Sequence, residues 1–201
     1  MLNAVVTGMI AITYAVSPMA APGGTGTAAR PTAGVEVAVV TVNGSGCPAG
    51  EGAAVLNDEL DVLTITAPAY FAWVGGGARP TDFRKNCQFS VQITRPAGWT
   101  YAVTQVRSGG FTALADGATG LSRVALYFQG SSATTTLSNT FTGPSVDRWD
   151  TTDTIAPAEW SYAPCGVERN LNINTELRVG LGTSPATTSS FLIREPTSSY
   201  R

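Results

Sequence analysis

The feature of this sequence that most restricts its fold is a two-residue alternation of apolar and polar side chains. Residues 87–93 read CQFSVQI and residues 171–179 read LNINTELRV, so that every second side chain belongs to a mainly apolar set. Successive side chains of a β-strand point to opposite faces, and alternation of this length therefore predicts strands with one buried face. The same pattern predicts further strands at 35–42, 60–67, 99–108, 122–129 and 134–142.

Short segments rich in glycine, proline and asparagine separate these predicted strands. Such residues favour turns, because glycine tolerates positive φ and proline fixes φ. No segment carries a helical stripe of useful length. Many strands joined by short turns predict an all-β fold, a β-sandwich with a jelly roll as one arrangement. The turn segments are NGSGCPAG (43–50), VGGGARP (74–80), RPAGW (95–99), ADGATG (115–120) and TGPSVD (142–147).

The size and charge of the chain exclude several classes of protein. Of the 201 residues, about 170 remain for a folded body, and a domain of that size buries about 70% of its unfolded surface, so it needs no metal to fold. The formal net charge is −2, Lys85 is the only lysine and no basic stripe is present, which argues against a nucleic-acid binder. Histidine is absent, which excludes a Ser-His-Asp triad, a Cys-His pair and an HExxH zinc site. We expect no cofactor and no bound metal.

The first 21 residues have much of the composition of a signal peptide. The first charged residue is Arg30, and the mostly apolar stretch 4–16 has the length of a signal-peptide core, shorter than the ~20 residues that a membrane span needs. Pro18 would end a helix, and Ala20 and Ala21 are small residues suited to cleavage, although no lysine or arginine precedes the apolar stretch. We predict a signal peptide at 1–21, a linker at 22–34, a β-sandwich domain at 35–194 and a tail at 195–201. The protein is then secreted, with no stable membrane span.

The motifs of the body occur in one order, namely GCP (46–48), RKNCQ (84–88), PCG (164–166) and LNINT (171–175). This set resembles the secreted family called domain of unknown function 4360, and the resemblance covers roughly residues 37–190. It implies export and a β-rich fold, and it carries no established activity. Members of that family usually extend further and end near a fourth cysteine, whereas this chain ends in FLIREPTSSYR.

The cysteines are best explained by a structural disulfide. Arg84 and Lys85 precede Cys87, and adjacent cations can activate a thiol, but no histidine is present to act as its base. In an exported chain, Cys47 and Cys87 can close a loop of 40 residues, which stabilises by about 4 kcal/mol. Three cysteines allow three single bridges. The family resemblance favours Cys47–Cys87, with Cys87–Cys165 as the alternative, and Cys165 is then left outside the bridge or links two chains.

Two features of the sequence suggest ligand contacts. The segment 145–152, SVDRWDTT, reads as an exposed loop in which Trp149 could stack on a sugar ring. The predicted strand 171–179 has a polar outer face, which is either a recognition strip or a solvated sheet face. The strip residues are Asn172, Asn174, Glu176 and Arg178. Glu176 and Arg178 can also form a surface ion pair, which contributes about 0–1 kcal/mol.

Trp99 and Tyr101 lie two apart on a predicted strand and are expected in the core.

Carboxylates provide weaker metal and catalytic hypotheses. Asp147, Asp150 and Asp153 are spaced by three, and oxygen ligands suit Ca²⁺, but turn residues explain the pattern at least as well. The side chains of Asp58, Asp61 and Glu176 carry carboxylates that could serve as acid and base in glycoside hydrolysis, yet no motif singles out a pair.

These observations favour a secreted, non-catalytic binding module whose partner is a glycan or another cell-surface component. The alternative is a structural envelope protein that associates with itself through Cys165 or through exposed strand edges. A histidine-free hydrolase is the third hypothesis.

Overall fold

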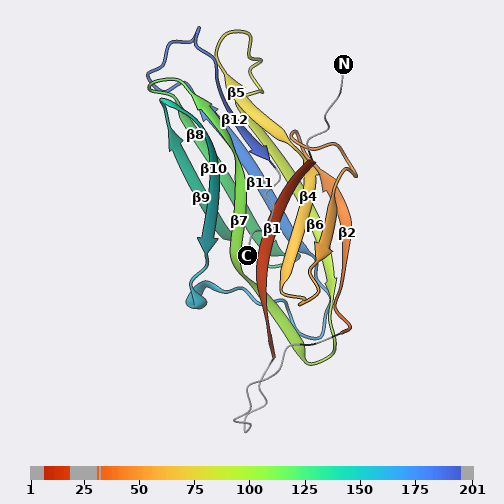
Figure 1. Ribbon diagram of the computed structural model, residues 1–201. Coiled ribbons are helices and arrows are strands. Elements are labelled where there is room, and N and C mark those ends of the chain that lie inside the picture. Colours follow the sequence, from red (N-terminus) through yellow and green to blue (C-terminus); the bar gives the residue numbers. More distant parts are fainter. Residues whose placement is uncertain (1–6, 19–30, 32, 196–201) are drawn as a thin grey trace.

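The chain folds into two antiparallel β-sheets that pack face to face as a β-sandwich (Figure 1). The computed structural model describes residues 7–18, 31 and 33–195. The five-stranded sheet has the order β2 (Glu36–Asn43), β6 (Arg84–Thr94), β11 (Leu171–Gly180), β8 (Thr119–Phe128) and β9 (Thr135–Thr142). The seven-stranded sheet has the order β3 (Ala53–Leu56), β4 (Val62–Pro68), β1 (Thr7–Pro18), β7 (Trp99–Leu114), β12 (Ser190–Glu195) and β5 (Tyr70–Val74), with β10 (Ser145–Thr154) also paired to β7.

The long strand β7 organises the seven-stranded sheet. Along one edge it pairs with β10 over residues 105–114. Its other edge is shared by two strands in succession, since β1 pairs over 99–107 and β12 pairs over 109–113. The β3–β4 hairpin is therefore hydrogen-bonded into this sheet through β1.

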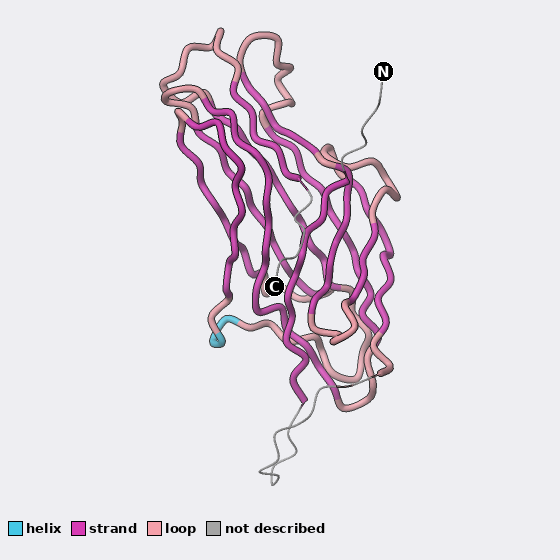
Figure 2. The backbone as a smooth tube through the Cα atoms, in the orientation of Figure 1, coloured by secondary structure: helices cyan, strands magenta, loops and turns pink. Residues whose placement is uncertain are grey.

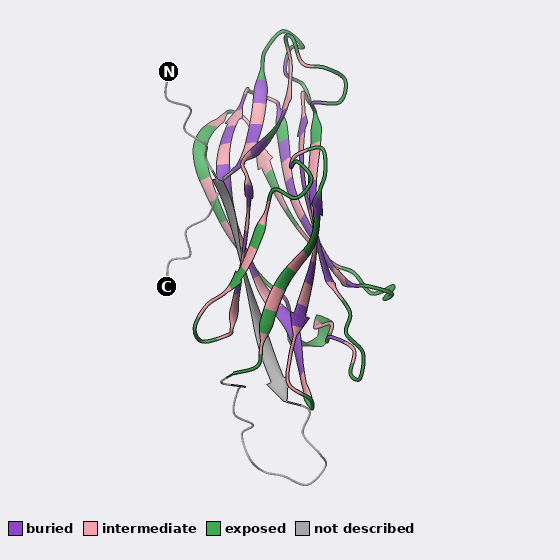
Figure 3. Cartoon of the chain, turned by 90° about the vertical axis from the view of Figure 1, so that its right-hand side faces the viewer, coloured by how far each residue is buried: buried purple, intermediate pink, exposed green. Residues whose placement is uncertain are grey.

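Alternate side chains of the strands fill the space between the two sheets. β8 alternates strictly between buried and less buried positions, and β6 does so from Cys87 onward. Figure 3 shows the same alternation along several strands, with exposed residues in the loops at both ends and also along some of the strands. Each large apolar side chain removed from water in this way contributes about 1.5–3 kcal/mol. The largest fully buried side chains include Tyr101, Phe89, Leu63, Ile65, Leu171 and Ile173.

The structure confirms the all-β prediction, and each predicted strand overlaps an observed one. The expected strands correspond to β2, β4, β6, β7, β8, β9 and β11. The strands β3, β5, β10 and β12 were not predicted, and the exposed loop expected around Trp149 is wrong because 145–154 is strand β10. The single helical element among the described residues is one short 3₁₀ turn, Pro157–Glu159, which Figure 2 shows in cyan.

Residues 7–18 include most of the apolar stretch 4–16 of the predicted signal peptide, and the structure places them in the sheet as β1; residues 4–6 lie outside the described residues. This strand pairs antiparallel with β4 on one side and with β7 on the other. The signal peptide itself stays a prediction. Within the described ranges, none of the structure forms a helix long and apolar enough to cross a membrane.

A disulfide joins Cys47 and Cys87, with the two Cα atoms 5.4 Å apart, so the predicted pairing is confirmed. Both cysteines are buried. The bridge fastens the loop that follows β2 to the start of β6, and the Gly46 amide donates a hydrogen bond to the Asn86 carbonyl beside it at 2.8 Å. It therefore closes one end of the five-stranded sheet covalently.

Two buried polar contacts tie the sheets together. The hydroxyls of Tyr70 on β5 and Thr175 on β11 are 2.7 Å apart. The guanidinium of Arg194 on β12 donates to the hydroxyl of Ser108 on β7 at 3.0 Å and to that of Ser122 on β8 at 2.8 Å. Because Ser122 belongs to the opposite sheet, Arg194 spans the interior of the sandwich. Burial lowers the pKa of this guanidinium, while Tyr70 and Asp153 act in the opposite direction.

Candidate functional site

The polar strip predicted on strand 171–179 lies on the outer face of the five-stranded sheet. Residues that pair directly across antiparallel strands share a face, and Asn172 pairs with Ser90, Asn174 with Gln88 and Glu176 with Asn86. The strip is therefore continuous with the polar side chains of β6. Asn172 and Glu176 are nevertheless buried among their neighbours, with exposed fractions of 8% and 7%, so a ligand lying on this face would reach mainly the other members.

Glu176 is held by two arginines. Arg84 donates from Nε to one carboxylate oxygen at 2.6 Å, and Arg178 donates from Nε to the other at 2.5 Å. Burial alone would raise the pKa of this carboxyl, but the hydrogen bonds from Arg84 and Arg178 outweigh it and the net shift is downward. The ion pair expected between Glu176 and Arg178 is thus confirmed, with Arg84 as a third member. These contacts give Glu176 a structural role, whereas the Arg84 and Arg178 side chains remain 48% and 44% exposed.

Trp149 does not join this strip. It lies on β10 in the other sheet, half-buried against the core, with its ring centroid 5.1 Å from that of Phe141. The Arg194 guanidinium lies over the same indole at 5.9 Å from the centroid. Trp149 is therefore an interior residue that fills space beside the buried arginine.

The three aspartates considered as calcium ligands lie along β10, where neighbouring side chains alternate in direction. Asp150 accepts a hydrogen bond from Arg107 at 3.1 Å, and Asp153 accepts one from Asn139 at 2.8 Å. Strand geometry places Asp147 and Asp153 on one side and Asp150 on the other. Among the described residues, no three His, Cys, Asp or Glu side chains gather in a group that could hold a metal ion.

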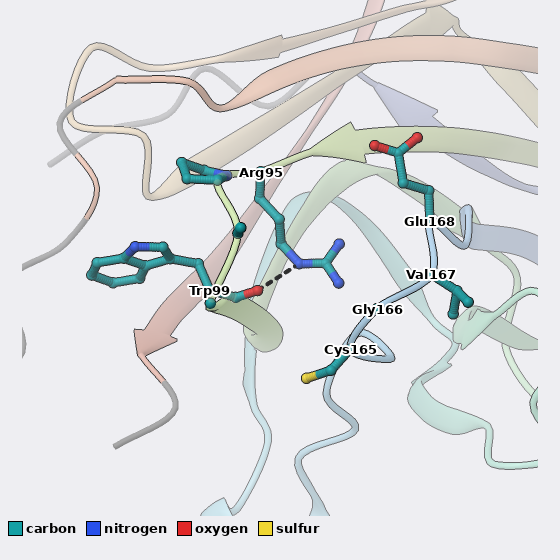
Figure 4. A pocket seen from close by; sticks show the side chains of 9 residues that line it. Arg95, Trp99, Cys165, Gly166, Val167 and Glu168 are labelled. Carbon is teal, nitrogen blue, oxygen red and sulfur yellow. Dashed lines mark hydrogen bonds between the residues drawn. The ribbon is translucent and has the colours of Figure 1, made fainter. Parts of the chain in front are cut away.

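A hollow of about 290 Å³ opens at one end of the sandwich, between the turn that joins β6 to β7 and the segment that leads into β11 (Figure 4). One wall is formed by residues 95–99 and the other by residues 165–168. The volume is close to the lower limit of ordinary small-molecule sites, which suits a ligand the size of one sugar ring. Arg95, Trp99 and Glu168 are among the residues that line the hollow. Figure 4 shows the Arg95 guanidinium between the two walls, the Trp99 indole on the side of the 95–99 wall that faces away from Cys165, and the Glu168 carboxylate directed away from Cys165.

Arg95 fixes the two walls relative to each other. Its Nε donates to the Trp99 carbonyl at 2.8 Å, and a terminal nitrogen donates to the Pro164 carbonyl at 2.7 Å. Figure 4 shows the guanidinium between Trp99 and the Gly166 segment. A guanidinium has five N–H donors, and these two bonds use two of them. The guanidinium also lies over the buried Tyr101 ring, 5.7 Å from its centroid. The core position expected for Tyr101 is confirmed, whereas Trp99 is only partly buried and lines the hollow.

Two glycines shape the walls of the hollow. Gly98 and Gly166 have φ angles of 84° and 73°, in the left-handed region that glycine adopts without steric cost. A Cβ added at either position would meet no atom within 4 Å. The backbone conformation, and not lack of space, therefore favours glycine at both turns.

Glu168 connects the hollow to the polar face of the sheet. Its carboxylate accepts a hydrogen bond from the Gln92 amide of β6 at 2.7 Å. One step further along, Asn170 donates to the Ser90 hydroxyl at 3.0 Å. A ligand larger than one ring could therefore continue from the hollow onto the outer face of β6 and β11.

Cys165 lies in the same hollow. It is exposed and takes no part in the Cys47–Cys87 disulfide, as the family resemblance led us to expect. The hollow as a whole was missed by sequence reasoning because its walls are about seventy residues apart in the chain. The two turn motifs RPAGW and PCG were its only local signals.

A second, larger hollow lies along the edge strand β9. Its volume is about 480 Å³, and it is lined by residues 133–137 and 158–161. The indole of Trp160 faces the same region, but its N–H already donates to the Ile155 carbonyl at 2.9 Å. Glu159 is the one charged residue in its lining. This hollow provides a matched comparison for experiments on the first.

A buried carboxylate braces the turn before β6. Asp82 accepts hydrogen bonds from the backbone and the side chain of Arg79, at 3.0 to 3.1 Å, and from the Lys85 ammonium at 3.0 Å. Its own carbonyl accepts the Trp73 amide at 2.9 Å. The Arg79 and Lys85 bonds hold the pKa of the Asp82 carboxyl well below its usual range.

This lowered pKa predicts a loss of stability in acid. Because the folded pKa of Asp82 lies below the unfolded value of about 4, its contribution is complete above that pH and is lost as the pH falls towards the folded pKa. Glu176 shifts in the same direction and adds to the effect. Urea unfolding should therefore show a lower free energy of unfolding at pH 3 than at pH 7. Asp82→Asn should be less stable at pH 7 and should show a smaller difference between the two conditions. Equal pH dependence in the variant and the parent would contradict this role for Asp82.

Comparison with known proteins identifies a family that this chain matches and a protein to which it is similar. A family model described as "Domain of unknown function (DUF4360)" matches residues 33–199. A protein from Arthroderma benhamiae named "Uncharacterized secreted protein" is 31% identical over 145 residues, which are 72% of this chain. The matched region spans 59% of that protein's length. The name agrees with the predicted secretion. No solved structure matches this chain.

Proposed function

Since the chain belongs to the family described as domain of unknown function DUF4360, and a relative is named as a secreted protein, we propose that it is a secreted, non-catalytic binding module for carbohydrate. The observation that carries the proposal is the hollow between residues 95–99 and 165–168. Export places such a module where cell-surface glycans are its accessible partners.

The chemistry of the hollow suits a sugar ring. The apolar C–H face of a sugar packs against an indole, and Trp99 supplies one on the outer side of the 95–99 wall. Hydroxyls of the ring need both donors and acceptors, which the Arg95 guanidinium and the Glu168 carboxylate provide. Arg95 and the disulfide-braced sandwich hold these groups on a rigid frame, so little conformational entropy is lost on binding.

A longer glycan would continue over the outer face of β6 and β11. From Glu168 the polar surface runs through Gln92 and Asn170 to Asn172, Asn174, Glu176 and Arg178. Asn174 and Arg178 are the more exposed members of this strip and would make the direct contacts. Asn172 and Glu176 would support them from below.

The test is a glycan array probed with the full chain, followed by calorimetry on any glycan that binds. Trp99→Leu should weaken binding by about tenfold or more, because the stacking surface is lost while an apolar side chain is kept. Trp160→Leu is the matched control at the second hollow and should leave the affinity unchanged. Circular dichroism would verify that both variants are folded. A blank array would remove the carbohydrate ligand, and loss of binding in Trp160→Leu alone would move the site to β9.

A second candidate function is self-association, and the exposure of Cys165 favours it. A bridge between two Cys165 residues would join two sandwiches at their hollows. Size-exclusion chromatography of exported protein, with and without reductant, separates the two functions. A reducible dimer that Cys165→Ser abolishes supports self-association, and a monomer under both conditions eliminates the Cys165-linked form of it.

A further inference from the structure

The strand β1 occupies a gap inside the seven-stranded sheet. Thr7–Thr13 pairs with Val62–Pro68 of β4, and Ala11–Pro18 pairs with Trp99–Arg107 of β7. Both pairings are antiparallel, so β1 completes two hydrogen-bond ladders at once. In Figure 1 this strand, drawn in dark red, runs along β7 beside β4.

Without β1, both neighbours would present an unpaired strand edge. The β3–β4 hairpin would also lose its hydrogen-bonded connection to the rest of the sheet in the described structure. With β1 in place, the inward side chains of these neighbours lie in the core, since Leu63, Ile65, Tyr101 and Val106 are at most 1% exposed. Without β1, the gap would be bordered by two rows of backbone groups that need partners.

The strand that fills the gap is separable from the body. The family match begins at residue 33, after β1. Residues 4–16 are also the stretch that predicts an export signal, with Ala20 and Ala21 as small residues suited to cleavage. A cut after these residues would detach β1 from the chain but would not remove its ladder partners.

We propose that the gap between β4 and β7 is a strand-acceptor site for the N-terminal segment Thr7–Pro18. The segment stays bound in the gap after the chain is cut between it and β2, and the exported protein is then a non-covalent complex of two pieces. Recognition of this kind depends on main-chain hydrogen bonds along both edges of the inserted strand, with affinity from the ladders and register from the side chains. The bulge between Thr13 and Tyr14 marks one register on the β7 side.

The test uses the full chain with a site-specific protease sequence inserted after Gly24. After complete cleavage, the two fragments should elute together in size-exclusion chromatography, and mass spectrometry of the peak should find both. Urea should release the short fragment. Fragments that separate under native conditions would overturn the proposal, whatever the body does afterwards.

Substitutions in β1 identify the ladder as the cause of retention. Ile12 pairs with Leu63 on one side and with Val106 on the other, and proline there removes an amide from a central strand. Ile12→Pro should release the fragment on cleavage, whereas Thr25→Pro, outside β1, should retain it. Retention by both variants would show that the strand ladder is not responsible.

Hydrogen exchange of the uncut chain gives an independent measurement that does not depend on a variant folding. Peptides that cover 7–18 should exchange at least about tenfold more slowly than unstructured peptides, with protection close to that of β11. Exchange of 7–18 at the rate of an unstructured peptide would contradict the proposal.

Discussion

Replacing Cys47 and Cys87 together by serine should lower the free energy of unfolding by about 4 kcal/mol. The bridge closes a loop of 40 residues, and its loss returns the entropy of that loop to the unfolded chain. Both cysteines are buried in the same core cluster as Tyr70 and Phe89, so the two serine hydroxyls would add a desolvation cost. Urea unfolding of the parent and the double variant under oxidising conditions measures the difference.

The control for this prediction is Cys165→Ser. Cys165 is exposed and outside the bridge, and we expect the substitution to change the free energy of unfolding by less than about 0.5 kcal/mol. Reductant should destabilise the parent by about the same amount as the double variant. A double variant within about 1 kcal/mol of the parent would contradict the role of the disulfide as the main covalent brace.

Replacing Arg194 by alanine should destabilise the fold by about 3 kcal/mol. The side chain is buried, donates to Ser108 and Ser122 on opposite sheets, and lies over the ring of Trp149. Alanine leaves a cavity and removes the donor from both hydroxyls. The loss should appear in urea unfolding and as a fall in the thermal midpoint.

Arg194→Met is the matched comparison. It retains most of the volume and removes a charge whose burial is costly, and replacement of buried charges by apolar groups is often close to neutral. We expect Arg194→Met to lie within about 1 kcal/mol of the parent. A loss as large as that of alanine would show that the charge itself holds the sheets together, and no loss in alanine would contradict the inter-sheet role.

The strands of the core could be predicted from the sequence, because a strand with one buried face has apolar residues at every second position. β6 and β8 lie within the five-stranded sheet and bury every second side chain over most of their length, so their sequences alternate. β11 alternates in sequence as well, although Asn172 and Glu176 on its polar face are also buried. β10 is an edge strand whose polar sequence SVDRWDTTDT predicts a loop, because an edge strand of this kind lacks a clear apolar alternation. β3, β5 and β12 have only four to six residues each, which is too short for an alternation of apolar and polar residues to be recognised.

Less of the candidate site was predictable. The polar strip on β11 was located from alternation alone, but its burial depends on Arg84 and on side chains from other strands. The hollow depends on tertiary structure, because Arg95 meets the Pro164 carbonyl only once β6 and β11 have paired. The burial of Arg194 has no sequence signal, since a charged residue near a chain end is ordinarily assigned to the surface.

The hollow between residues 95–99 and 165–168 is the ligand site that we propose. The most direct measurement is an NMR titration of the full ¹⁵N-labelled protein with oligosaccharides selected on the array. We expect amide shift changes concentrated at Ala97–Trp99 and Cys165–Glu168, with smaller changes at Asn174 and Arg178. Saturable shifts confined to β9 and Trp160, or no shifts with any oligosaccharide, would contradict it.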